Sequence, residues 1–162
     1  MNEYLSYFRV PKLKVEATMT LVGLAPRGVR LFLAEHSMFR AGPDEPADLF
    51  RDKREFIPVE DPEWGLVLLR RAAIMVMSLP IDRHEQYTEQ AHGAKVADIH
   101  DRTEVAVFLR DGTLLRGLVG SFRLDVHRRM QDFLNEQEPF FLVREEEAVH
   151  FIHKEWIVWV KP

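Results

Sequence analysis

The amino-acid sequence predicts an all-β protein built from two tandem, small, five-stranded antiparallel barrels with short helical or irregular insertions. The first observation is a repeat: residues 48–61, DLFRDKREFIPVED, return without a gap at residues 132–145 as DFLNEQEPFFLVRE. The second is that short apolar runs, separated by turn residues, flank both copies in the same order. The third is the spacing of the turns, roughly 8–12 residues, which is typical of small sandwiches and barrels.

Each copy reads as about five short strands. The first copy contains VEATMTLVGL, a turn around Pro26 and Gly28, VRLFLAEHSMF, the repeated segment, and LVLLRRAAIMVMSLP. The second contains TEVAVFLR, the turn Asp111-Gly112, LLRGLVGSF, the repeated segment, and VHFIHKEWIVWVKP. An Asp-Gly pair between apolar runs is a strong hairpin signal, because it supplies the positive φ angles of a tight turn.

These boundaries divide the chain into an N-terminal arm (residues 1–14), a first barrel (15–80), a linker (81–103) and a second barrel (104–162). The linker is polar and contains Gly93, and we expect one or two helical turns near residues 85–91. The arm combines aromatic and basic side chains: Tyr4, Tyr7, Phe8, Arg9, Lys12 and Lys14. It either docks on the barrels as a strap, which is the favoured interpretation, or binds RNA or a membrane surface.

Composition narrows the class of protein. The 162 residues include 22 Lys and Arg against 26 Asp and Glu, a net charge of −4, and 46% hydrophobic residues, as in soluble globular proteins. The absence of cysteine excludes disulfides and a cysteine nucleophile. No apolar run approaches the ~20 residues that a bilayer span requires, and the amino end has no signal-peptide core. We expect a cytoplasmic protein with no membrane contact and no cofactor.

Two motifs of the second copy carry a family resemblance. Residues 111–122, DGTLLRGLVGSF, place an Asp-Gly hairpin before Gly117 and the aromatic Phe122. Residues 151–160, FIHKEWIVWV, form two apolar runs joined by a tight turn. Together they resemble the two signatures of Sm and Sm-like proteins, and residues 15–80 resemble them more faintly. The resemblance implies a small Sm-like barrel in each copy, rings formed through edge strands, and RNA as a partner.

The same resemblance identifies candidate ligand positions. Where RNA-binding Sm-like proteins carry an Asp and an Asn, this chain has Arg123 and His127, and His153-Lys154 replaces their Arg-Gly. The candidate ligand- or RNA-binding residues are Phe122, Arg123, His127, Arg128, Arg129, His153, Lys154, Arg70 and Arg71. For the arginine cluster, a solvated charged surface is the favoured interpretation, since nearby carboxylates offset its charge, and a site for RNA or another anion is the alternative.

The last strand of each copy indicates assembly. Every side chain from Trp156 to Val160 is apolar, and residues 72–77 are similar, so both faces of these strands require burial. An exposed edge of this kind aggregates unless it pairs, and either the sister barrel or another chain can supply the partner. The candidate interface residues are Trp156, Val158, Val160, Ala73, Met75 and Met77. By resemblance, three chains would form a closed ring of six barrels.

Signals for catalysis are missing from the sequence. It has no phosphate loop, no GxGxxG, no GxSxG and no HExxH. His84, His92 and His100 recur at a spacing that does not align them on one helix face, and we predict no metal site. Asp48 and Asp132 are interpreted as turn caps rather than catalytic groups. We therefore expect a non-catalytic binding or assembly module that acts through a homo-oligomer, with an RNA-binding protein as the second hypothesis and an enzyme as the third.

Overall fold

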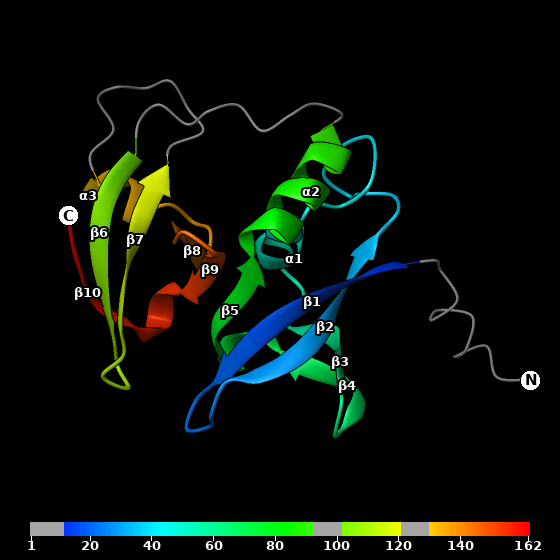
Figure 1. Cartoon of the computed structure of the whole chain (residues 1–162), viewed down its shortest axis with the longest axis horizontal. Helices are drawn as coiled ribbons and strands as arrows, with labels where there is room; N and C mark the ends of the chain where they lie inside the picture. Colours follow the sequence, from blue (N-terminus) through cyan, green and yellow to red (C-terminus); the bar gives the residue numbers. More distant parts are fainter. Residues whose placement is uncertain (1–11, 93–101, 121–129) are drawn as a thin grey trace, which may run out of the picture.

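The computed structural model describes residues 12–92, 102–120 and 130–162 and is mostly β-structure (Figure 1). The elements of the first half are β1 (Lys12–Leu21), β2 (Arg27–Ala34), α1 (Pro46–Arg51), β3 (Phe56–Asp61), β4 (Gly65–Arg70), the 3-10 helix η2 (Arg71–Ala73) and β5 (Ile74–Pro80). Helix α2 (Ile81–His92) follows. The elements of the second half are β6 (Arg102–Leu109), β7 (Leu114–Gly120), α3 (Met130–Leu134), β8 (Phe140–Arg144), β9 (Ala148–His153), the 3-10 helix η3 (Lys154–Trp156) and β10 (Ile157–Lys161).

All ten strands belong to one antiparallel sheet, in the order β10-β6-β7-β8-β9-β5-β1-β2-β3-β4. Within each half the order is the same: the fifth strand lies beside the first, followed by the second, third and fourth. Figure 1 shows the two halves side by side, with β5 and β9 pairing between them. The strands described therefore form an open, continuous sheet with β10 and β4 as its edges, rather than two separately closed barrels.

The repeat in the sequence coincides with a repeat of strand pairing. The β3–β4 ladder sets Phe56 opposite Arg70, and the β8–β9 ladder sets Phe140 opposite His153. The ladders of β5 on β1 and of β10 on β6 also shift register at equivalent places. Even this local irregularity is thus common to both halves.

Glycines with positive φ make the hairpin turns. Gly112 has φ 90°, and the Asp111 carboxylate accepts a hydrogen bond from the backbone N–H of Thr113 at 2.9 Å, which confirms the predicted second turn. The prediction for the first turn is wrong in detail. Gly23, with φ 73°, provides the left-handed residue there, whereas Gly28 lies inside β2.

The predicted arm and linker also need correction. Strand β1 begins at Lys12, so the last three residues assigned to the arm are already in the sheet, and residues 1–11 lie outside the described residues. The first part of the linker is the 12-residue helix α2 rather than one or two turns, because Ile81 and Tyr87 pack against the core. None of the described helices is long and apolar enough to cross a membrane.

The hydrophobic core has two clusters, one in each half, and the β5–β9 pair contributes to both. Phe151 of β9 packs into the first-half cluster, whereas Met75 and Val76 of β5 pack into the second-half cluster. Side chains from both faces of β5 are consequently buried, as expected for a strand with no polar face. This junction makes one folded unit of the two halves.

Candidate functional site

The structure brings together three of the predicted ligand-binding residues. Arg70, Arg71 and His153 line one cavity of about 520 Å³ at the junction of the two halves, which we call the junction pocket. The full lining comprises Arg51, Asp52, Lys53, Arg54, Glu55, Arg70, Arg71, Ala72, Gln137, Glu138, Pro139, Phe140 and His153. The other predicted residues of this set, Phe122, Arg123, His127, Arg128 and Arg129, lie outside the described residues.

Positive charge exceeds negative charge in the junction pocket. The cationic side chains are Arg51, Lys53, Arg54, Arg70 and Arg71, and the acidic ones are Asp52, Glu55 and Glu138. The Nε of Arg54 is 2.6 Å from Asp52, and a guanidinium nitrogen of Arg70 is 3.9 Å from Glu55. Lys53 is exposed and has no hydrogen-bond or ion-pair partner in the part of the chain described. The pocket is therefore suited to an anion.

Arg71 is the buried cation of the pocket. It is only 7% exposed, and its Nη2 donates to the carbonyl oxygen of Phe50 at 2.6 Å. Its Nη1 donates to the carbonyl of Arg54 at 3.3 Å, and its Nε has no hydrogen-bond partner among the described residues. Burial lowers the pKa of this guanidinium. Burying this cation is costly. The nearby charge of Asp52 offsets part of the cost, and an anion bound in the pocket would offset more of it.

His153 contributes a neutral hydrogen-bond donor. Burial lowers the pKa of its imidazole, and the nearby Arg71 charge lowers it further, against the opposing effect of Glu155. Its Nδ1 accepts a hydrogen bond from the backbone N–H of Glu155 at 3.2 Å, so the ring proton is assigned to Nε2. The ring meets Phe140 edge-on, with centroids 4.8 Å apart.

Lys154 lies next to His153 in the chain but not in the pocket lining. Its Nζ donates to the carbonyl oxygen of Glu136 at 3.0 Å, and burial lowers its pKa. Its backbone N–H donates to the carbonyl of Pro139 at 2.9 Å. The structure therefore gives Lys154 a role in holding the connection between α3 and β8.

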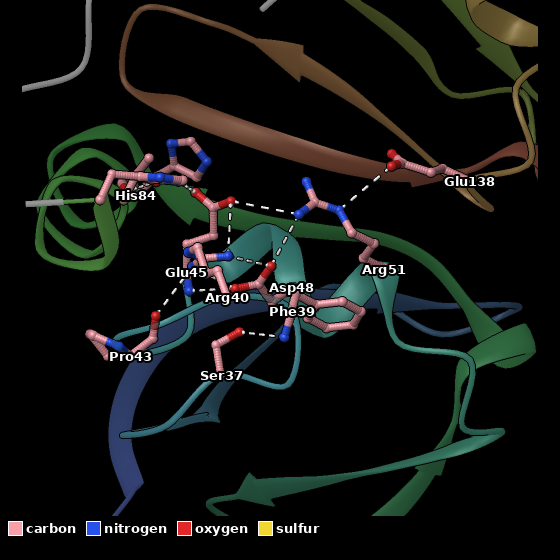
Figure 2. Close-up of polar contacts among 11 residues, drawn as sticks. Ser37, Phe39, Arg40, Pro43, Glu45, Asp48, Arg51, His84 and Glu138 are labelled. Carbon is pink, nitrogen blue, oxygen red and sulfur yellow. Dashed lines mark hydrogen bonds and ion pairs between the residues drawn. The ribbon is translucent and has the colours of Figure 1, made fainter.

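Arg51 joins the pocket to a buried ionic cluster (Figure 2). Its Nη1 lies 3.1 Å from the carboxylate of Asp48, while its Nε lies 3.5 Å from Glu138 of the second half. Asp48 is 1% exposed, forms a second ion pair of 2.7 Å with Arg40, and accepts the backbone N–H of Glu45 at 2.9 Å. Asp48 thus caps the start of α1, as interpreted, but its carboxylate accepts an upstream rather than a downstream amide.

Sequence reasoning missed Arg51, Lys53 and Arg54, although the repeat contained a signal for them. The first copy reads RDKR at residues 51–54, and the second reads NEQE at residues 135–138. The apolar residues on either side are retained in type, so only the charge of this connection differs between the copies. Because of that difference the first copy supplies all five cationic side chains of the pocket, whereas the second copy supplies one carboxylate, Glu138.

The predicted interface residues separate into two groups. Met75 and Met77 are buried within the chain: Met77 lies opposite Phe151 of β9, and Met75 packs into the second-half core cluster, so the sister half supplies the partner of both. Ala73 is half-buried in η2, and Trp156 donates its indole N–H to the neighbouring carbonyl of Ala72 at 3.4 Å. Val160 is half-buried on β10. Val158, also on β10, is 55% exposed.

No group of three or more His, Cys, Asp or Glu side chains among the described residues is arranged to hold a metal ion. Comparisons of the chain with family models, with curated proteins and with solved structures found no match. The argument for function therefore depends on the pocket and on the surfaces of the sheet.

Proposed function

We propose that this chain is a non-catalytic binding module that acts as a homo-oligomer and holds an anionic ligand, single-stranded RNA, in the junction pocket. The observation that carries the ligand is the excess of cationic side chains in the pocket, centred on the buried Arg71 that no described carboxylate pairs with. The net charge of −4 makes such a local basic site the means of binding, rather than a general attraction for nucleic acid.

The proposal treats each half as a small Sm-like barrel. The common strand order of the two halves supports this, and so does Gly117 in β7. A Cβ at Gly117 would lie 2.5 Å from the carbonyl oxygen of Arg144 and 2.6 Å from a methyl carbon of Val143. Glycine is therefore required where β7 approaches β8, at the position of the glycine in the first Sm-like signature.

RNA suits the chemistry of this pocket better than a compact inorganic anion does. Guanidinium groups bind phosphate oxygens in a fixed, bidentate geometry, and Lys53 adds a mobile charge at the rim. The ring of Phe56, 44% exposed, lies 4.7 Å from the guanidinium carbon of Arg70. An exposed aromatic face beside arginines is the arrangement on which unpaired bases stack.

The test is a fluorescence anisotropy titration of labelled single-stranded RNA, U-rich and A-rich, at two salt concentrations. Wild-type binding should saturate and weaken with salt, because phosphate contacts release counterions. Lys53→Glu with Arg54→Glu should weaken binding by at least about tenfold, since two phosphate contacts are replaced by repulsion. Arg83→Glu, an exposed change of the same sign on α2, is the matched control and should leave affinity nearly unchanged.

Two results would contradict the proposal that RNA binds in the junction pocket. Absence of RNA binding at tens of micromolar protein would show that the pocket does not hold this polymer. Binding that is equally tight in the Lys53/Arg54 double variant and in the wild type would show that RNA binds elsewhere.

A further inference from the structure

A serine, a histidine and a carboxylate meet where β5 pairs with β9. Ser78 of β5 lies opposite His150 of β9 in the antiparallel ladder, and both residues are half-buried. The hydroxyl oxygen of Ser78 is 2.6 Å from Nδ1 of the His150 imidazole. On the other side of the ring, Oε1 of Glu145 lies 3.4 Å from Nε2. We call these three residues the junction triad, and none of them lines the junction pocket.

The order of these contacts determines the hydrogen-bond roles in the triad. A neutral imidazole carries one proton and a carboxylate can only accept, so the proton is assigned to Nε2 of His150, facing Glu145. Nδ1 is then the acceptor, and the Ser78 hydroxyl donates to it. Burial lowers the pKa of His150, against the opposing effect of Glu145, so the ring is mostly neutral at neutral pH. A hydroxyl that donates to an oriented, neutral imidazole is the arrangement that activates a serine.

The β8–β9 hairpin holds the carboxylate of Glu145 within reach of the ring. The backbone N–H of Glu145 donates to the carbonyl of Ala148 at 2.8 Å, and the carbonyl of Glu147 accepts the backbone N–H of Ile81 at 2.9 Å. Nε2 of His150 is buried and has no hydrogen bond of ordinary geometry among the described residues. Hydrogen bonds of this kind are often long in a ligand-free protein and shorten when a ligand binds. Glu145 is therefore a positioning residue for the imidazole.

The repeat shows that the fold does not require a histidine at this place. The β3–β4 and β8–β9 hairpins are equivalent, and Val59 and Val143 occupy the same place in the repeated segment. Val59 lies opposite Val67, whereas Val143 lies opposite His150. A valine thus takes the place of the histidine in the first half. A cross-strand serine–histidine contact can be purely structural, but that role does not account for the carboxylate on the far side of the ring.

A hollow of about 750 Å³ lies beside the triad. Its lining includes Thr18, which lies opposite Ser78 on β1, and Pro80, which is two residues beyond Ser78 on the same face of β5. Gly28 lies opposite Thr18, and the space that a Cβ of Gly28 would enter is open. The hollow therefore has room for a small group carried by the Ser78 oxygen.

The charges around the hollow select the chemical class of that group. The acidic side chains of its lining are Glu16, Glu60 and Asp61, against one cation, Arg30. Glu145 adds a further carboxylate at the triad. A phosphoryl donor carries several negative charges, which these carboxylates would repel. An uncharged carboxylic ester meets no such repulsion.

We propose that Ser78 is an activated nucleophile that accepts an acyl group from an uncharged, activated carboxylic ester. The Ser78 oxygen forms a bond to the carbonyl carbon of the ester, and the bond from that carbon to the leaving oxygen breaks. The hydroxyl proton of Ser78 moves to Nδ1 of His150 and from there to the leaving oxygen. The products are O-acyl-Ser78 and the free alcohol, so no other reactant takes part.

The strand ladder limits the site to a single acylation. Strand β5 is an interior strand, with β9 on one side and β1 on the other. The backbone N–H groups beside Ser78 therefore bond to neighbouring strands and do not serve as oxyanion donors. Hydrolysis of the acyl-serine needs the same donors and should be slow. Ser78 is thus a site of covalent modification, which goes beyond the proposed binding function and is compatible with it.

Acylation by p-nitrophenyl acetate tests the proposal. Peptide mass spectrometry of the treated full chain should find acetyl groups on Ser78 sooner than on Ser37, which is also half-buried but donates to no histidine in the part of the chain described. His150→Gln should slow the acetylation of Ser78 by at least about tenfold, because it removes the general base. His36→Gln, at an exposed histidine, is the matched control and should keep the wild-type rate. Thermal melts verify that both variants are folded.

Nitrogen NMR spectra of the imidazole test the triad without any reagent. In the wild type, His150 should carry its proton on Nε2. In Glu145→Ala the proton should shift towards Nδ1, from which it can be donated to the Ser78 hydroxyl, because the buried Nε2 has lost its acceptor. The rate of Ser78 acetylation should fall in the same variant. Glu146→Ala, at an exposed carboxylate of the same hairpin, is the matched control and should change neither property.

Three results would overturn the proposal. The first is acetylation of Ser78 that is no faster than that of Ser37. The second is an unchanged rate in folded His150→Gln, and the third is a wild-type His150 with its proton on Nδ1. The proposed function is tested separately, by RNA affinity and by the mass of the assembly in sedimentation velocity.

Discussion

His84 connects the stability of the fold to pH, and its replacement should remove much of that dependence. The imidazole lies on α2, is 3% exposed, and its Nδ1 has no hydrogen-bond partner among the described residues. Its ring centroid is 5.9 Å from that of Phe151. Burial lowers the pKa of His84 from 6.5 to about 4, and the positive charge of Arg144 acts in the same direction.

The sign and size of the effect follow from that pKa. The folded state binds the proton less well than the unfolded state, so the contribution to stability is complete above 6.5 and is lost as the pH falls from there towards 4. At about 1.4 kcal/mol per pKa unit, the free energy of unfolding should decrease by about 3 kcal/mol across this range. His150 and His153, whose pKa values burial also lowers, should add to the decrease in the wild type.

The measurement is urea unfolding followed by tryptophan fluorescence, from above pH 6.5 to about pH 4, for the wild type and His84→Leu. In the variant, unfolding should take up as much as one proton fewer than in the wild type. The slope of the unfolding free energy against pH should therefore be smaller by as much as about 1.4 kcal/mol per pH unit. His36→Leu, at an exposed histidine, is the control and should retain the wild-type slope.

A proton NMR titration of the imidazole would provide the independent check. If the His84 resonance titrates near 6.5 in the folded protein, or if His84→Leu unfolds with the wild-type pH dependence, then the ring is not held neutral by burial. The reasoning from its environment would then be refuted.

Three other substitutions test local features of the fold by chemical denaturation. Gly117→Ala should destabilise the protein by about 1–3 kcal/mol, because the added Cβ would meet backbone atoms. Gly28→Ala is the control and should change stability little, because the space around its Cβ is open. Equal effects of the two substitutions would contradict the close approach of β7 and β8. Asp48→Asn should cost about 3 kcal/mol, since it removes the buried carboxylate that pairs with both Arg40 and Arg51 and leaves Arg40 only its longer, 3.7 Å pair with Glu45, whereas the exposed Asp132→Asn should cost little. The ion pair with Arg27 lowers the pKa of Asp61 from 3.8 to about 2. The wild type should therefore lose stability as the pH falls from 3.8 towards 2, and Asp61→Asn should not show this loss. The same pH dependence in the variant and the wild type over this range would contradict the assignment.

The sequence determined the local features of this fold because their physical causes lie close together in the chain. The Asp111-Gly112 pair predicts a hairpin since a positive φ depends on the residue itself, and Gly112 has φ 90°. The apolar run of residues 72–77 predicts a strand buried on both faces, and residues 74–77 are buried in this way in β5, whereas residues 72 and 73 belong to η2. The 84-residue repeat predicts that the elements of one half recur in the other, and they recur in order.

Only the tertiary structure decided what those elements meet. An apolar strand shows that it needs a partner but not which one, and the pairing of β5 with β9 joins residues that are far apart in the chain. For the same reason Arg51 and Glu138, in equivalent connections of the two copies, become neighbours across the junction pocket. Side-chain type and spacing determine which faces of an element require burial, whereas the packing of distant segments determines what covers them and which charges share a pocket.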